Sequence, residues 1–231
     1  MKTHNMQRIG LLMAVLFIGG LLGTAVTVQP TAAQILNTLS DDEVADLLYM
    51  REEEKLAHDV YITLYTQWGY PVFDNIATAE QTHTAAVLQL MTLYGIADPT
   101  TGNGVGVFVN NDLQALYDDL VAQGSQSLPA ALRVGGLIEE TDILDLEASI
   151  AATDHADIQF VYGNLLAGSK NHLRAFASVY ERMTGEPYQP QILDQATFDA
   201  IMNDTNGNGN GRRGGRRGAG NQGNGGLGCN Q

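Results

Sequence analysis

The sequence predicts an all-α protein: a four-helix bundle with a long crossover between its second and third helices, and flexible segments at both ends of the chain. Apolar residues recur at helical spacing in four long segments between residues 40 and 184. Capping residues, glycine and proline separate these segments. No alternating pattern is long enough for a sheet, since "GVGVFV" at residues 104–109 would make at most one short extended piece.

The first two helices are bounded by residue types with known preferences. Ser40 is the expected N-cap of the first helix, and Glu43 follows three residues later in a capping-box pattern. This helix stops at Gly69, which is followed by Tyr-Pro. The second helix is expected over residues 74–94, and Gly95 ends it.

A long connection follows, with a short helix expected at residues 111–123. The third long helix is expected over about residues 128–152, with a proline in its first turn. Asp154 is the expected cap of the fourth, which ends at Gly185. A last short helix is expected at residues 194–202.

The two ends of the chain differ from this middle part. Residues 1–33 have a basic start, an apolar run and small residues before Ala33, which predict a secretory signal peptide. The run is long enough to span a bilayer, so an N-terminal membrane anchor is the alternative. Residues 205–231 are rich in Gly, Asn and Arg and predict a disordered tail. We therefore expect an exported protein, periplasmic, extracellular or anchored at the outer face, with its bundle at residues 34–204.

The charge of the chain is concentrated in the bundle. All 26 acidic residues lie between Asp41 and Asp204, with only six of the 12 basic residues, so the formal charge of this part is −20. Such a domain repels nucleic-acid phosphates and attracts cations, although solubility alone would also explain it. Cys229 is the only cysteine, which excludes an intrachain disulfide and a thiolate cluster. A buried metal would therefore need carboxylates and imidazoles, as iron, manganese or zinc accept.

Each long helix carries an ionisable residue midway along its apolar face. At about 100° per residue, the residues on these faces are Glu54, Glu80 with His83, Glu139, and His172. Asp142 lies at the edge of the third face, and Glu53 lies on the flank of the first as a second choice. His58 lies off the face and is expected at the surface.

Buried carboxylates need a partner, because an unpaired buried charge is costly. Three carboxylates and two imidazoles suit a pair of divalent cations in the core of a bundle. Glu80 and His83 are three residues apart and so are neighbours on one helix face. Nearby glycines at 135, 136 and 168 cost about 1 kcal/mol each in helix propensity, either to make room beside a metal or to let helices pack closely.

Four stretches resemble a known family: "REEEKLAHDVY", "AEQTHTAAV", "GGLIEETDILDL" and "GSKNHLRAF". They are similar to the ferritin-like superfamily, and more closely to a bacterial and archaeal ferritin-like family of unknown function, over residues 39–184. In the superfamily, helices one and three each give a Glu, and helices two and four each give Glu-x-x-His. Its first Glu is often followed by Ala and Tyr, and Glu54, Ala57 and Tyr61 fit this pattern, which favours Glu54 over Glu53.

The sequence departs from this pattern in the fourth helix, where Ser169 stands in place of the glutamate. Asp142, one turn after Glu139, is the candidate substitute for the missing carboxylate. A more weakly held second ion, or a site for a single ion, is the alternative.

The function expected from the resemblance is a metal site that binds iron or manganese, two ions in the main interpretation, with oxygen- or peroxide-linked redox chemistry such as ferroxidase or peroxidase turnover. Its ligands would be Glu54, Glu80, His83, Glu139, His172 and Asp142. The expected partners are metal ions and a small oxidant, with no nucleic acid. Membrane association through the N-terminus and a homodimer are left open. The alternatives are a non-catalytic metal-binding or structural module of the cell envelope, and a metal-free interaction domain whose acids pair with Lys or Arg.

Overall fold

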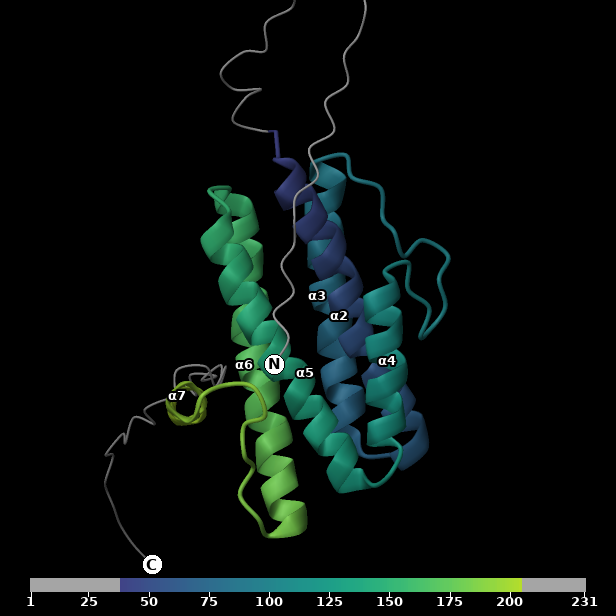
Figure 1. Ribbon diagram of the computed structural model, residues 1–231, viewed down its shortest axis with the longest axis vertical. Helices are drawn as coiled ribbons and strands as arrows, with labels where there is room; N and C mark the ends of the chain where they lie inside the picture. Colours follow the sequence, from purple (N-terminus) through teal and green to yellow (C-terminus); the bar gives the residue numbers. More distant parts are fainter. Residues whose placement is uncertain (1–37, 205–231) are drawn as a thin grey trace, which may run out of the picture. The chain divides into compact units, whose positions relative to one another are not determined.

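The computed structural model describes residues 38–204, and in this part of the chain it contains helices and no β-strand (Figure 1). The helices are α2 (Asp41–Trp68), α3 (Pro71–Leu93), α4 (Asn111–Gly124), α5 (Leu128–Ala152), α6 (Ala156–Thr184) and α7 (Gln195–Asn203). The all-α prediction is confirmed. The predicted leader and tail lie outside the described residues. Within the described range, no helix is long and apolar enough to cross a membrane.

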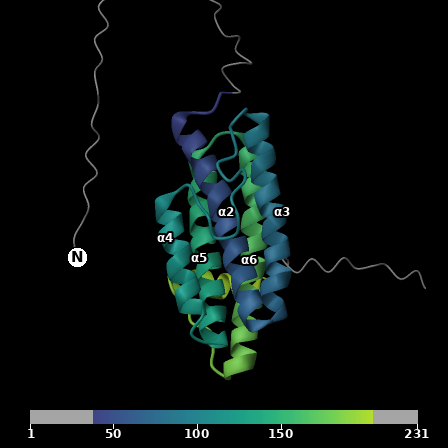
Figure 2. The same ribbon diagram turned by 90° about the vertical axis from the view of Figure 1, so that its right-hand side faces the viewer.

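The four long helices are arranged as two helical hairpins. α2 packs against α3, α5 packs against α6, and further contacts of α3 with α6 and of α2 with α5 join the two pairs. Figures 1 and 2 show α4, the helix of the long crossover, running back along the outside of α2 and α5. The short α7 packs against α6.

Most helix ends follow the expected capping chemistry. Ser40 and Glu43 form the complete capping box of α2, because each side chain accepts the other residue's backbone N–H. Gly69 and Gly185 end α2 and α6 in the left-handed conformation, with φ of 61° and 76°.

Two expected helix starts are wrong. α3 begins at Pro71, ahead of residue 74, because the fixed φ and missing N–H of proline suit the first helical turn. Asp154 does not cap α6. The Thr153 hydroxyl accepts the His155 N–H at 3.1 Å, His155 occupies the N-cap position, and Asp154 remains exposed.

Residues 104–109, the candidate of the sequence for one short extended piece, form no β-strand. The chain turns at Gly106, whose φ is 75°. The Gly106 N–H donates to the Asp59 carboxylate of α2 at 2.8 Å. The backbone groups of this segment therefore bond to side chains of α2 and to Gln114 of α4 instead of to another strand.

Charged residues of α2 hold the crossover in place. The Glu52 carboxylate accepts the N–H groups of Val109 and Asn110, both at 2.7 Å. Arg51 forms an ion pair with Asp98 at 3.0 Å. Both α2 side chains are buried by the segment that they bind. Asn110, which Glu52 binds, is the N-cap of α4, and its side chain accepts the N–H groups of Asp112 and Leu113.

The core of the bundle contains two apolar clusters with an ionisable layer between them, and a third cluster joins α5 and α6 to α7 and the segment before it. The first cluster includes Leu64, Phe73, Leu132 and Phe176. The second includes Met50, Met91, Leu146 and Tyr162. On each long helix, the ionisable residues lie between the stretches that contribute to the two clusters. The candidate ligands are therefore shielded from water on both sides along the bundle axis.

Candidate metal centre

Glu80 of α3 lies at the centre of the ionisable layer. Its Oε2 lies 2.8 Å from Nδ1 of His83, and its Oε1 lies 2.7 Å from Nδ1 of His172. His83 Nδ1 also lies 3.2 Å from Glu54 Oε2, and His172 Nδ1 lies 3.4 Å from Glu139 Oε2. The layer thus joins side chains from α2, α3, α5 and α6.

These five residues form two groups of three that share Glu80. One group is Glu54, Glu80 and His83, and the other is Glu80, Glu139 and His172. In each group, one ligand-type atom of every residue lies within 4.8 Å of those of the other two. Because carboxylate oxygens and imidazole nitrogens are common ligands of iron, manganese and zinc, this spacing suits one cation in each group.

The His83 ring packs against the backbone of α6 at Gly168. A Cβ atom on Gly168 would lie 2.5 Å from His83 Nε2. The side chain is missing at this position to make room for a candidate ligand, as one of the two explanations from the sequence had it. His83 Nδ1 faces Glu54 and Glu80 on the other side of the ring.

Gly168→Ala is expected to lower the free energy of unfolding by about 1–3 kcal/mol, because the added methyl group must displace the His83 ring from its carboxylates. Gly163→Ala is the matched control on the same helix, since a Cβ there meets nothing within 4 Å. The control should gain up to about 1 kcal/mol from helix propensity. Chemical denaturation followed by circular dichroism measures both changes. Equal effects of the two substitutions would contradict the role given to Gly168.

The other two glycines make room for side chains that are not candidate ligands. A Cβ on Gly135 would lie 2.5 Å from the Phe176 ring, and one on Gly136 would lie 2.1 Å from the Tyr188 hydroxyl oxygen. Phe176 belongs to α6, so the explanation by close helix packing applies at Gly135. Tyr188 lies in the segment between α6 and α7, so Gly136 makes room for that segment.

Hydroxyl groups contact two of the site carboxylates. The fully buried Tyr61 donates a hydrogen bond to Glu139 Oε1 at 2.5 Å. The buried Ser169 hydroxyl contacts Asp142 Oδ2, on the neighbouring helix. The serine that replaces the expected glutamate of α6 therefore faces the residue proposed as its substitute.

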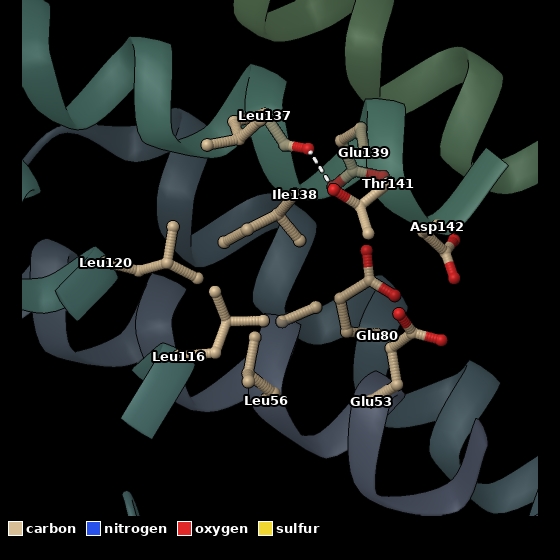
Figure 3. Close-up of a pocket in the computed structure, with 11 residues that line it drawn as sticks. Glu53, Leu56, Glu80, Leu116, Leu120, Leu137, Ile138, Glu139, Thr141 and Asp142 are labelled. Carbon is tan, nitrogen blue, oxygen red and sulfur yellow. Dashed lines mark hydrogen bonds between the residues drawn. The ribbon is translucent and has the colours of Figure 1, made fainter. Parts of the chain in front are cut away.

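Asp142 lies beside the two groups but belongs to neither of them. It is buried, and its Oδ1 has no hydrogen-bond partner among the described residues. The same holds for Oε2 of Glu53, the second choice on α2. Figure 3 shows Glu53, Glu80, Glu139 and Asp142 together at one end of a pocket.

The histidines and Glu80 compensate one another's charge. Burial by itself would raise the pKa of Glu80, but close contacts with the imidazoles of His172 and His83 lower it to about 2. Burial would also lower the pKa of both histidines. Contacts with Glu54 and Glu80 nevertheless raise the pKa of His83 to about 11, and contacts with Glu139 and Glu80 raise that of His172 to about 10. Both imidazoles are therefore protonated at neutral pH when no metal is bound.

The remaining carboxylates of the layer favour their neutral form. Burial, and then the charge of Asp142, raises the pKa of both Glu53 and Glu54. Burial also raises the pKa of Glu139. The pKa of Asp142 rises to about 8, first through burial and then through the charge of Glu139. Protons thus occupy positions at which a cation would neutralise the same groups.

No lysine or arginine in the described part of the chain forms an ion pair with these carboxylates. The ion pairs of basic residues there join Arg51 to Asp98, Lys55 to Asp59 and Lys170 to Glu147. This arrangement contradicts the version of the metal-free alternative in which the acids pair with Lys or Arg. His58, expected at the surface, is half-buried with Nδ1 2.8 Å from Asp59, outside both groups.

Glu140 has a role that the sequence did not indicate. It is fully buried beside Glu139 and turned toward the segment before α7. Its carboxylate accepts hydrogen bonds from the Tyr188 hydroxyl and the N–H groups of Gln191, Ile192 and Leu193, at 2.7–3.0 Å. Glu140 directly follows Glu139, so at about 100° per residue its side chain points away from the apolar face of α5. No local signal in the sequence indicates that a distant segment covers it.

Fold and site together define an all-helical protein with buried carboxylate and histidine groups that could hold metal ions. Residues 43–205 match the family described as "Uncharacterized protein domain (DUF2202)", and the chain belongs to this family. The chain is 46% identical over 164 residues to the "Uncharacterized protein MJ0754" of Methanocaldococcus jannaschii. The aligned residues cover 71% of this chain and 88% of the relative. The crystal structure of hypothetical protein MJ0754 matches with a TM-score of 0.69, over 71% of this chain and 93% of that one.

Proposed function

We propose that this protein is a ferritin-like bundle whose buried site holds two divalent cations, iron or manganese. The observation that supports this most directly is the sharing of Glu80 between two groups of three ligand-type residues. A carboxylate with two oxygens directed at two different imidazoles is suited to bridge two ions. The export expected from residues 1–33 remains a prediction.

The residues present fit such ions in chemistry and in environment. Glu54 Oε1 is buried without a hydrogen-bond partner among the described residues, which is costly unless a cation or a proton satisfies it. Glu54 and His83 would hold one ion, Glu139 and His172 the other, with Glu80 between them. Asp142 would supply a further carboxylate next to Glu139.

Bound iron or manganese would supply redox chemistry toward oxygen or peroxide, and this is the activity that we propose. The protein's own part is to orient the ligands and keep water out. Tyr61 keeps Glu139 in place through its hydrogen bond, and Ser169 does so for Asp142. The apolar clusters above and below the layer exclude water, which strengthens electrostatic interactions within it.

A second candidate function is a metal-binding module without turnover. The contact of Ser169 with Asp142 favours it, because it engages one oxygen of the carboxylate that would replace the missing glutamate. With fewer free ligands, the second ion would be held more weakly or be absent. The bundle would then use its cation for stability alone.

Elemental analysis of the purified full chain, combined with assays of oxygen and peroxide consumption, tests both candidates. We expect two equivalents of iron or manganese in the unmodified protein and a clear loss in His83→Ala. His58→Ala is the matched control, since His58 lies on α2 outside both groups. No metal in any sample contradicts both candidates. If the protein contains metal but consumes neither oxygen nor peroxide, the second candidate, a metal-binding module without turnover, is supported.

Metal binding should stabilise the protein more as the pH rises. The raised pKa values of His83 and His172, about 11 and 10 against an ordinary 6.5, give stability that is full below about pH 6.5 and is lost as the pH rises through those values. The pKa of Asp142 is raised from an ordinary 3.8 to about 8, so its contribution to stability is also lost as the pH rises through this range. A cation replaces these protons. The increase in Tm on adding Mn²⁺ should therefore be larger at about pH 8.5 than at about pH 6, as thermal denaturation would show.

The same reasoning expects at least two protons to leave the protein when it is loaded at neutral pH, one from each imidazole. A pH indicator in weak buffer measures this release. A Tm increase that is independent of pH, with no proton release, would contradict binding at these histidines.

A further inference from the structure

An apolar cavity of about 230 Å³ lies between α2, α4 and α5. Its apolar wall consists of Leu56 and Ala57 from α2, Leu116 and Leu120 from α4, and Leu137 and Ile138 from α5. Figure 3 shows these leucines and the isoleucine on one side of the pocket and the carboxylates on the other. The cavity thus begins next to the ionisable layer and extends away from it toward the crossover helix.

Apart from the carboxylates at one end, the residues that line the cavity provide few hydrogen-bonding groups for a polar ligand. The Thr141 hydroxyl, which also lines it, donates to the Leu137 carbonyl at 2.9 Å and is not free. The remaining wall is made of leucine, isoleucine and alanine side chains. Apolar cavities of about 150 Å³ with such linings stay dry and bind benzene or xenon. This cavity is larger, so an aromatic ring or a short alkyl chain fits its volume.

We propose that this cavity is a binding site for a small apolar molecule, of the size of an aromatic ring or a short alkyl chain, held with one end beside Glu53 and Asp142. Burial of apolar ligand surface against the wall supplies the affinity. As a binding site it is independent of metal. As the site of a substrate for the neighbouring centre, it rests on the function proposed above.

The helix α4 is the part of the wall that can admit such a molecule. Leu120 is buried, while Leu116 lines the cavity and is also 38% exposed to solvent. The cavity therefore reaches the solvent-exposed surface at Leu116. The crossover thus has a role beyond connecting α3 to α5, because it closes an apolar space against the ionisable layer.

Benzene binding to the purified full chain, measured by isothermal titration and by the rise in Tm, tests the proposal. We expect saturable binding of one benzene per chain. Leu120→Phe, which fills the cavity from α4, should weaken it at least tenfold. Leu144→Phe, at an exposed position of α5 outside the lining, should leave it unchanged. Unsaturable binding, or equal affinity in the two variants, overturns the proposal.

Two further variants keep the test decisive if Leu120→Phe disturbs folding. Leu116→Ala, at a half-exposed position, should enlarge the cavity and raise the affinity for naphthalene severalfold. An unchanged naphthalene affinity in this variant counts against the proposal. His83→Ala should keep benzene binding while losing metal. Loss of benzene binding together with the metal would overturn the assignment of benzene to this cavity. If the protein binds no metal but still binds benzene, the proposed function fails and the proposal of an apolar binding site stands.

Discussion

Glu80→Gln is expected to abolish the binding of both metal ions, whereas Glu54→Gln should affect only one. Glu80 is the residue shared by the two candidate groups, and its two oxygens face different histidines. The amide keeps the size of the side chain but removes the negative charge and one acceptor oxygen. We expect the metal content to fall from about two equivalents to near zero, since loss of one ligand in each half weakens both.

Elemental analysis after removal of loosely bound ions measures this loss, with helical content as a check on folding. Glu147→Gln is the matched control, because Glu147 is an exposed residue of α5 that pairs with Lys170. Retention of both ions by Glu80→Gln would contradict the bridging role. Loss of one ion would mean that Glu80 serves a single group.

Glu140→Ala should lower the free energy of unfolding by about 3–5 kcal/mol, the largest stability effect that we expect from one substitution. The fully buried carboxylate accepts four hydrogen bonds, three of them from consecutive backbone N–H groups at Gln191, Ile192 and Leu193. Removal leaves these donors without this partner. The Leu193 N–H is buried, and an unsatisfied buried donor costs about 1–3 kcal/mol, whereas the N–H groups of Gln191 and Ile192 are partly buried.

Denaturant titration followed by circular dichroism measures the loss. Glu140→Gln should cost less than the alanine variant, because its carbonyl oxygen can still accept from the backbone. Glu147→Ala, an exposed ion-pair partner, should change stability by less than about 1 kcal/mol. A Glu140→Ala protein as stable as this control would show that the segment at residues 188–193 is not held by Glu140.

The contrasting roles of neighbouring glutamates show what helical periodicity can predict about a buried residue and what it cannot. On α2, the apolar period predicts that Glu54 points toward the core, and the structure agrees, while Glu52, two residues earlier, points to another side of the helix. Glu52 is nevertheless buried, because the crossover folds over it and bonds to it. On α5, in the same way, Glu139 points into the site, while its neighbour Glu140 is buried by a distant segment that it binds. Helical periodicity relates a residue to its own helix, but which loop covers the other faces depends on contacts with residues far away in the sequence.

The same limit explains the errors at the start of α6 and in the crossover. The residues around Asp154 offered several capping groups, and the one used depends on where the chain turns between α5 and α6. The segment at residues 104–109 has a strand-like composition, but no strand lies beside it among the described residues. Its backbone groups bond to the side chains of Asp59, Glu52 and Gln114 instead.

The sequence by itself determined the helices and which ionisable side chains turn toward the core, because both follow from 3.6-residue periodicity and capping chemistry within each helix. It also indicated that Glu54, Glu80, His83, Glu139 and His172 lie at one depth. Only the tertiary structure decided that Glu80 is the shared member, that Asp142 faces Ser169, and that Glu52 and Glu140 hold distant segments. These features depend on how helices are rotated against one another and on which loops cover them, and long-range packing determines both.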